Sequence, residues 1–308
     1  MNKYMIFKSR VVGLRFNRSW SSAIEVSPVK LSYTVHDQET PREEPRKSPV
    51  LFLHSALNSK RDLASLSKAL NQLTKRTIIA IDARNHGESP DAPEMSWESM
   101  AADVKLLSEN LKLNKSILMG HSMGGGIMVF TALKYPHLAE KLVVIEANPI
   151  ETSQSLFNMS KTLKKLLTVD FQGLQTLDEA KKHATDALCH LIPSASVRDR
   201  FTEMIKEVSP GKFGWARNLP VIARDFERHV ISFPWSSYIS IFQKDPFTKP
   251  SLFIGGGQSD FLAVKHYEEL KKLFPRAEFA IIEGANHWLH LQKPTEFLKI
   301  SSEFINSD

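Results

Sequence analysis

The chain has 308 residues, of which 42% are hydrophobic and 24% are charged, which is the composition of an ordinary globular protein and argues against a disordered or fibrous chain. No run approaches the roughly 18 consecutive apolar residues of a membrane-spanning helix. The single cysteine, Cys189, excludes a disulfide within the chain and argues against a cysteine-based metal site. At about 150 residues per domain, the length allows two domains or one large α/β domain.

The net charge of +6 is concentrated at the N-terminus. Residues 1–24 contain five basic residues and no acidic one, which leaves 35 basic and 34 acidic residues in the rest of the chain. Because that remainder is nearly neutral, nucleic acid is not expected as a partner. A basic, serine-containing, acid-free segment is typical of a mitochondrial transit peptide, and a disordered basic tail is the alternative.

Short apolar runs alternate with amphipathic stretches along most of the chain, which predicts buried strands alternating with helices. This alternation is typical of a mostly parallel sheet that is covered by helices on both faces. Strands are expected at 29–35, 49–53, 77–81, 116–119, 142–145, 251–254 and 279–282, and helices at 62–73, 96–111, 124–135, 265–273 and 295–305.

The alternation stops between residues 151 and 249, where the pattern is mostly helical and no strong strand is expected. We therefore expect an α/β core formed by residues 25–150 and 250–308, with residues 151–249 inserted as a helical cap. The cap contains apolar residues such as Phe157 and Trp235, which suit the cover of an acyl-binding site or simply form the interior of the cap itself.

The segment Gly120-His121-Ser122-Met123-Gly124 lies between a predicted buried strand and a predicted helix. This is the context of a nucleophile elbow, in which glycines permit a tight turn and the serine is exposed at the carboxyl edge of the sheet. The N–H of Met123 would lie at the helix N-terminus, where it can stabilise developing negative charge. Ser122 is therefore the predicted nucleophile.

A serine nucleophile needs a base, and His287 is the best candidate. It lies 165 residues after Ser122, in a predicted loop between the last strand and the final helix. A histidine at that position can reach a nucleophile at the same edge of the sheet. His54 and His121 adjoin the predicted site and are expected to shape it.

These features resemble the α/β-hydrolase superfamily and, within it, the subgroup of abhydrolase domain-containing protein 11 and its bacterial esterase relatives. The resemblance implies an α/β-hydrolase fold over residues 30–308, a serine hydrolase that needs no metal or organic cofactor, and a diacylglycerol lipase-like activity in mitochondria, with the matrix as the expected compartment. It also implies a role beside 2-oxoacid dehydrogenase complexes. The shared stretches are residues 82–90, 120–125, 273–277 and 285–288.

The predicted oxyanion loop departs from the superfamily pattern. The run is His54-Ser55-Ala56-Leu57, where the superfamily usually has His-Gly, and the next residue, Ala56, would give the second oxyanion N–H beside that of Met123. A Cβ at Ser55 would be strained if the backbone there requires a positive φ. An altered oxyanion hole is therefore one expectation for this loop.

The acid that orients His287 has two candidates. Asp260 follows the strand at 251–254, 27 residues before His287, at the superfamily's usual position, and we favour it because a carboxylate there can accept from the histidine Nδ1–H. The subgroup resembles another arrangement, whose counterparts here are Glu146 after the strand at 142–145 and Ser259 as an auxiliary group. Glu146 is longer by one methylene than the aspartate of that arrangement.

The sequence thus predicts a serine hydrolase that cleaves small-molecule carboxylic esters, with lipid or other acyl esters as the expected substrates. Two alternatives remain open at this point. A thioesterase would use the same residues, and a binding or protective protein could keep the fold with slow turnover. Ser55 in the oxyanion loop is the feature that favours the second alternative.

Overall fold

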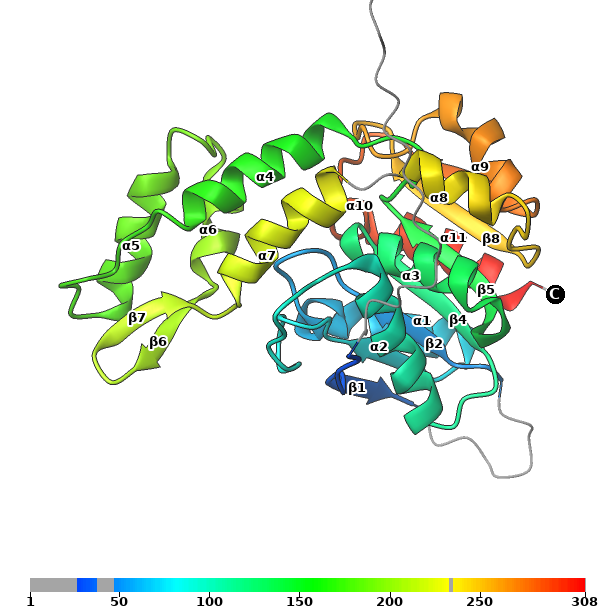
Figure 1. Ribbon diagram of the computed structural model, residues 1–308, viewed down its shortest axis with the longest axis horizontal. Coiled ribbons are helices and arrows are strands. Elements are labelled where there is room, and N and C mark those ends of the chain that lie inside the picture. The colour runs from blue at the N-terminus through cyan, green and yellow to red at the C-terminus, as the bar shows by residue number, and fades with distance from the viewer. Residues whose placement is uncertain (1–26, 38–46, 233–234, 308) are drawn as a thin grey trace, which may run out of the picture.

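The computed structural model describes residues 27–37, 47–232 and 235–307, which form a central sheet covered by helices and a large extension on one side (Figure 1). The expected transit peptide, residues 1–24, lies outside the described residues. None of the helices in the described part of the chain is long and apolar enough to cross a membrane.

The central sheet has seven strands in the order β1-β3-β2-β4-β5-β8-β9. All neighbouring strands are parallel except β1, which pairs antiparallel with β3 at one edge. Strands β2, β3, β4 and β8 are buried at every position, as expected for parallel strands covered on both faces. The predicted α/β-hydrolase fold is confirmed. The strand bounds are β1 (Tyr33–His36), β2 (Val50–Leu53), β3 (Ile78–Ile81), β4 (Ser116–His121), β5 (Ala139–Ile145), β8 (Ser251–Gly256) and β9 (Ala277–Ile282).

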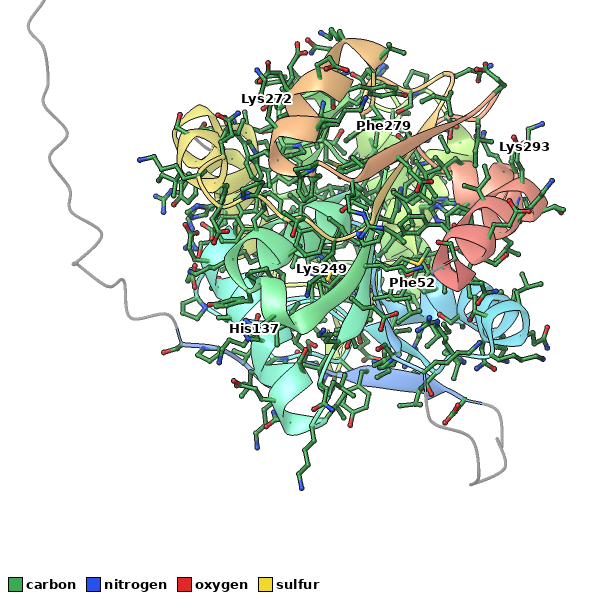
Figure 2. All side chains as sticks on the ribbon, turned by 90° about the vertical axis from the view of Figure 1, so that its right-hand side faces the viewer. Phe52, His137, Lys249, Lys272, Phe279 and Lys293 are labelled. Carbon is green, nitrogen blue, oxygen red and sulfur yellow. The ribbon has the colours of Figure 1, made fainter. Side chains whose placement is uncertain are left out.

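Alternate side chains of the strands enter two apolar cores, one on each face of the sheet. Leu51 packs in the core under α2, α3 and α9, whereas its neighbour Phe52 packs in the core under α1 and α11. Figure 2 shows Phe52 in the interior, with Lys272 and Lys293 at the periphery. The covering helices are α1 (Ala64–Thr74), α2 (Trp97–Asn110), α3 (Met123–Lys134), α9 (Tyr267–Leu273), α10 (Leu289–Gln292) and α11 (Pro294–Asn306), with short 3₁₀ turns η1 (Lys60–Leu63), η2 (Pro136–Leu138) and η4 (Val264–His266).

The insertion between β5 and β8 extends away from the sheet (Figure 1). Helices α4 and α7 run together outward from the core, and α5, α6 and the two-stranded hairpin lie at the far end. The hairpin was not predicted, because most of β6 is exposed and lacks the apolar run of a buried strand. The elements are α4 (Gln154–Leu166), α5 (Leu177–Leu188), α6 (Ala195–Thr202), β6 (Ile205–Ser209), β7 (Lys212–Trp215), α7 (Leu219–Asp225), the π-helical turn η3 (Phe226–Ile231) and α8 (Trp235–Phe242).

A buried ion pair fixes the loop after β3 to helix α2. The Arg84 guanidinium donates through Nε to Asp103 Oδ2 at 2.7 Å and through Nη2 to Asp103 Oδ1 at 2.8 Å, and both side chains are almost fully buried. Asp103 Oδ1 also accepts from Val29 N at 2.7 Å. The pair thus joins three segments of the chain that are far apart in the sequence.

Replacing Asp103 with Ala should destabilise the fold by about 3 kcal/mol, because the buried Arg84 guanidinium loses its two-fold contact with Asp103 and keeps only one carboxylate contact, with Glu94 at 3.0 Å. The free energy of unfolding is measured by urea titration followed by circular dichroism. The double variant Arg84→Met with Asp103→Leu should recover most of the loss, since an apolar pair removes both charges. Lys105→Ala on the exposed face of α2 is the control, and a loss in Asp103→Ala no larger than in this control would contradict the prediction.

Candidate active site

Ser122 lies at the sharp turn between β4 and α3, with φ 53° and ψ −115°. This conformation is rare for a residue with a side chain and costs about 1–3 kcal/mol, so the surrounding structure must hold it. Ser122 N donates to Ile145 O at 2.8 Å, and Gly126 N donates to Ser122 O at 3.0 Å. The predicted nucleophile therefore has the strained backbone of an elbow.

Gly124 brings the loop after β2 against this elbow. A Cβ at Gly124 would lie 2.4 Å from Leu53 O and 2.6 Å from His54 O, so only glycine fits. Because the chain continues from His54 to Ala56, the predicted oxyanion loop adjoins the first turn of α3, which begins at Met123. The two predicted oxyanion donors, Ala56 and Met123, thus come from neighbouring segments at the carboxyl edge of the sheet.

The expected strain at Ser55 is absent from the structure. Ser55 is not among the residues with positive φ, and Leu57, two positions later, takes the left-handed conformation with φ 66°. Leu57 N donates to His86 Nε2 at 3.1 Å, which anchors the loop in this shape. The strain that a positive φ would have caused at Ser55 does not arise, because the left-handed residue of this loop is Leu57, one step beyond Ala56.

His287 is held from two sides. Its Nδ1 lies 3.0 Å from Glu146 Oε2, and the ring of Phe261 stacks on it with centroids 4.2 Å apart. His121 Nε2 donates to the backbone oxygen of His287 at 2.9 Å. Since a carboxylate only accepts, Nδ1 of His287 carries the proton, and Nε2 is left as the basic nitrogen. This is the tautomer that a general base needs.

The carboxylate of Glu146 is fully buried and is hydrogen-bonded on both oxygens. Oε1 accepts from Gly256 N at 2.6 Å, and Oε2 accepts from Ser259 Oγ as well as from His287. Glu146 has φ 54°, a left-handed conformation at the end of β5 that turns its side chain toward β8. Gly256 is required opposite it, because a Cβ there would lie 2.5 Å from Ala285 O.

Asp260, the favoured acid at the sequence level, lies elsewhere and does not pair with His287. Its side chain is exposed, and Oδ2 accepts from Ser155 N at 2.9 Å, in the first turn of α4. Asp260 points away from His287 because of the turn after β8, in which Ser259 N donates to Gly256 O at 3.0 Å. That turn directs Ser259 inward to Glu146 and the next residue outward. The contact expected for Asp260 is therefore made by the alternative acid, Glu146.

Two contributors to this site were not assigned these roles from the sequence. Phe261, which stacks on His287, carried no sequence signal beyond its place in the loop after β8. His121 was expected only to shape the site, and the structure makes it the donor that fixes the His287 loop. The only indication of this role in the sequence was the position of His121 directly before Ser122.

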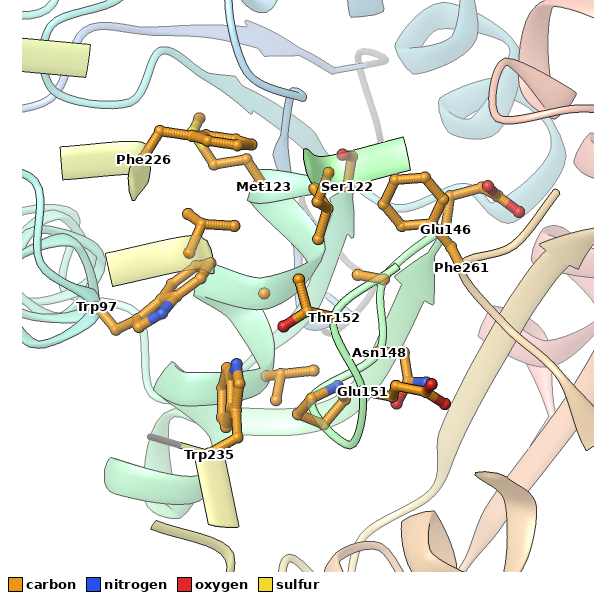
Figure 3. Close-up of a pocket in the computed structure, with 16 residues that line it drawn as sticks. Trp97, Ser122, Met123, Glu146, Asn148, Glu151, Thr152, Phe226, Trp235 and Phe261 are labelled. Atoms are coloured by element: carbon orange, nitrogen blue, oxygen red, sulfur yellow. The ribbon is translucent and has the colours of Figure 1, made fainter. Parts of the chain in front are cut away.

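An apolar cavity opens beside Ser122 (Figure 3). Trp97 and Met123 line it from the core, and Phe226 and Trp235 line it from the insertion, with Phe261 on the side of the histidine. The rings of Trp97 and Trp235 lie 5.9 Å apart between centroids. The cavity volume is only ≈ 50 Å³, so a long acyl chain can enter only after side chains at the cavity move.

Two histidines beside the predicted nucleophile, His121 and His290, are neutral. Burial lowers the pKa of His121 well below its ordinary value, and nearby His290 and His287 lower it further. Burial likewise lowers the pKa of His290 to about 3, helped by His287 and Arg200. These rings therefore act as hydrogen-bonding groups. Within the described part of the chain, no group of three or more His, Cys, Asp or Glu side chains is arranged to hold a metal ion.

Known proteins are similar to this chain over most of its length. Sn-1-specific diacylglycerol lipase ABHD11 of Mus musculus is 31% identical over 281 residues, which are 91% of this chain and 87% of the relative. Esterase YbfF of Escherichia coli is 28% identical, over 87% of this chain and 97% of the relative. Among solved structures, a marine microorganism esterase superposes with a TM-score of 0.73 at 27% identity, covering 90% of this chain and 99% of the other.

A family match covers most of the chain. Residues 48–294, from β2 to the start of α11, match the family described as having the alpha/beta hydrolase fold. The matched range includes the elbow at Ser122, the buried Glu146 and the histidine loop, so it spans both the core and the insertion. The chain belongs to the α/β-hydrolase family.

Proposed function

We propose that this protein is a serine hydrolase that cleaves carboxylic esters through an acyl-enzyme. The observation that carries the proposal is the contact of His287 with the buried carboxylate of Glu146, 3.0 Å away, at the same sheet edge as the strained elbow of Ser122. This is the acid, base and nucleophile set of acyl transfer.

In the proposed reaction, His287 Nε2 takes the proton of Ser122 Oγ as that oxygen attacks the ester carbonyl. The N–H groups of Met123 and Ala56 stabilise the resulting oxyanion. The intermediate collapses to an acyl-enzyme, and the alcohol leaves with the proton from His287. Water, deprotonated by His287, then attacks the acyl-enzyme and releases the carboxylic acid and free Ser122.

We assign Glu146 as the acid that orients His287, in place of Asp260. Glu146 is fully buried and its Oε2 is shared with Ser259, so the charge of the imidazolium that forms in the reaction meets a fixed carboxylate. Ser259 acts as an auxiliary group that holds this oxygen. Asp260, in the loop after β8, has a different role, since its side chain accepts a hydrogen bond from the first turn of α4 in the insertion.

We propose that residues 151–249 act as the substrate cap and that the acyl part of the ester lies in the apolar cavity. Phe226 and Trp235 of this segment line that cavity together with core residues. The diacylglycerol lipases among the relatives support a lipid ester as substrate, in particular an acylglycerol ester. A thioester would react with the same residues, so ester and thioester hydrolysis are to be measured side by side.

Ser122→Ala should lower kcat for p-nitrophenyl butyrate by about 10⁶-fold, to the limit of detection, and should abolish labelling by a fluorophosphonate probe. Glu146→Gln should lower kcat by about 10⁴-fold, because the amide presents the wrong hydrogen-bonding group to His287 Nδ1. Asp260→Asn is the matched control and should change kcat little. Turnover is measured by release of p-nitrophenol, with folding checked by circular dichroism.

The outcomes separate the alternatives. A large loss in Asp260→Asn together with a small loss in Glu146→Gln would return the role of the acid to Asp260. A folded wild-type protein that resists the probe and cleaves neither ester nor thioester would replace the enzyme by a binding protein.

Trp235→Ala should widen the acyl cavity and raise kcat/KM for p-nitrophenyl octanoate relative to the acetate by about tenfold or more, since each methylene accommodated in an apolar pocket is worth about 10-fold or more. Steady-state rates with the acetate, butyrate and octanoate esters give the ratio. Phe171→Ala removes an aromatic ring that packs on Trp215 in the insertion, away from the cavity, and should keep the wild-type ratio. An unchanged ratio in Trp235→Ala would place the acyl chain elsewhere.

We propose that residues 1–24 direct the protein to the mitochondrial matrix and that it acts there beside 2-oxoacid dehydrogenase complexes. The support is the acid-free basic segment together with the resemblance of the rest of the chain to its subgroup. Residues 1–30 fused to a fluorescent protein should bring it into mitochondria. The variant with the five basic residues of the segment replaced by glutamine should remain in the cytosol.

Two measurements test the two parts of this proposal separately. Cytosolic fluorescence of the unmodified fusion would contradict the targeting. The association predicts that the full-length protein isolated from mitochondria carries dehydrogenase subunits with it, and their absence would contradict that part alone.

A further inference from the structure

A second cavity lies near the nucleophile, between the core and the insertion, and its lining is polar. Its volume is ≈ 690 Å³, far larger than that of the apolar cavity. Ser55, His121 and His290 line it from the core, and Arg200, Met204 and Arg217 line it from the insertion. Because Ser55 precedes Ala56 and His121 precedes Ser122, this cavity adjoins both the oxyanion loop and the elbow.

Three buried polar atoms without a hydrogen-bond partner among the described residues belong to side chains that line this one cavity. They are Ser55 Oγ, Arg217 Nε and His290 Nδ1. Ser55 is 3% exposed and His290 is 4% exposed. These atoms are covered by neighbouring protein atoms, so they make the wall of the cavity polar without facing its space, and Arg217 is the half-buried charged residue of that wall. A large cavity with such a wall beside the oxyanion loop suits a polar ligand.

The charges of the lining favour an anion beside Arg217. Arg217 is half-buried, and burial lowers the pKa of its guanidinium more than the carboxylates of Asp82 and Asp62 raise it. Both carboxylates are already engaged, since Asp82 pairs with Lys60 and Asp62 accepts from Ser59 N at 2.7 Å. The positive charge of Arg217 is therefore incompletely compensated.

The remaining charged groups of the lining lie toward solvent. Asp199 and Glu203, at the end of α6, are exposed side chains. Arg61 is exposed and pairs with Glu88 at 2.7 Å, and Arg200 lies over the ring of Trp288 at 4.5 Å. His290 and His121 are neutral, as described above. Among the three arginines of the lining in the described structure, Arg61 and Arg200 are exposed and engaged in these contacts, whereas Arg217 is half-buried.

The two cavities can each hold a different part of an ester substrate. An ester carbonyl bound at Ser122, with its oxygen toward Ala56 and Met123, must direct its acyl and alkoxy parts in different directions. The apolar cavity suits the acyl part, which leaves the polar cavity for the alkoxy part. We infer that the polar cavity binds the leaving alcohol of the substrate and that this alcohol carries an anionic group, a phosphate or a carboxylate, held by Arg217 at the polar wall that Ser55 and His290 also form.

This inference rests on the proposed ester hydrolysis and narrows its substrate class to acyl esters of anionic alcohols. It differs from the uncharged diacylglycerol in the name of the relatives. A guanidinium suits phosphate and carboxylate equally, because both offer two oxygens to its parallel N–H groups.

The test compares three butyryl esters with the full-length protein: 1-butyryl-glycerol, 1-butyryl-glycerol 3-phosphate and O-butyryl-glycolate. The wild type should show a kcat/KM at least about tenfold higher for one of the two anionic esters than for the glycerol ester, as expected for a hydrogen bond to a charged group. The phosphate and glycolate arms identify which anion is preferred. Glycerol 3-phosphate and glycolate are also tested as competitive inhibitors of p-nitrophenyl butyrate hydrolysis.

Arg217→Gln should lower the ratio of anionic to neutral kcat/KM by about tenfold or more and raise the inhibition constant of the preferred anion by a similar factor. Arg217→Lys should keep part of the preference, since it retains the charge without the planar fork. Arg276→Gln removes an equal charge from an exposed position outside the lining of either cavity and should keep the wild-type ratio. If Arg217→Gln is poorly folded by thermal melting, Ser55→Ala should lower the same ratio by a smaller factor.

The results overturn the inference in distinguishable ways. Ester cleavage that depends on Ser122 but shows no preference for either anion would overturn this inference and leave the proposed function standing. A preference that survives Arg217→Gln would place the anion elsewhere and overturn the site. A wild type that cleaves no ester and is not labelled at Ser122 would overturn the proposed function and this inference with it.

Discussion

The hydrogen bond between His287 and the buried carboxylate of Glu146 organises this edge of the sheet. A fully buried charge is tolerated only when it is paired and hydrogen-bonded, and Glu146 meets this condition through Gly256 N, Ser259 Oγ and His287 Nδ1. These partners come from β8, from the turn after β8 and from the loop after β9. One side chain thus fixes the relative positions of the ends of three neighbouring strands, which is the precision that proton transfer requires.

The conformations that create this geometry are costly, and the sheet is what sustains them. Ser122 and Glu146 both have φ near +54°, and each stands at the end of a buried parallel strand. Ser122 N donates to Ile145 O, and Glu146 N donates to Ile254 O at 2.9 Å, so each strained residue is held by the adjacent strand. The strain of about 1–3 kcal/mol at each position is therefore offset by ladder hydrogen bonds that continue past the regular strands.

The sequence could predict the parts of this fold that depend on local patterns. Fully apolar strands, the elbow at Ser122 and a histidine after the last strand follow from runs and spacings. The partner of His287 could not be predicted from such patterns, because Ser259 and Asp260 are adjacent and one turn decides which of them faces inward. The hairpin of β6 and β7 was missed for a related reason. Its residues are mostly exposed, so its strands lack the burial pattern that makes other strands recognisable.

The insertion contributes residues to the lining of both cavities. The residues proposed to react and the residues proposed to select the substrate therefore come from different parts of the chain. The proposed nucleophile, base and buried acid all lie on loops at the ends of core strands, where parallel pairing leaves little freedom. Trp235 and Arg217, in contrast, come from the insertion, and one lines an apolar space whereas the other lines a polar one. A change in the insertion can therefore alter which ester is accepted without moving the reacting groups. The same core can serve other substrates in relatives whose insertions differ, because fold and chemistry are set by residues that the insertion does not supply.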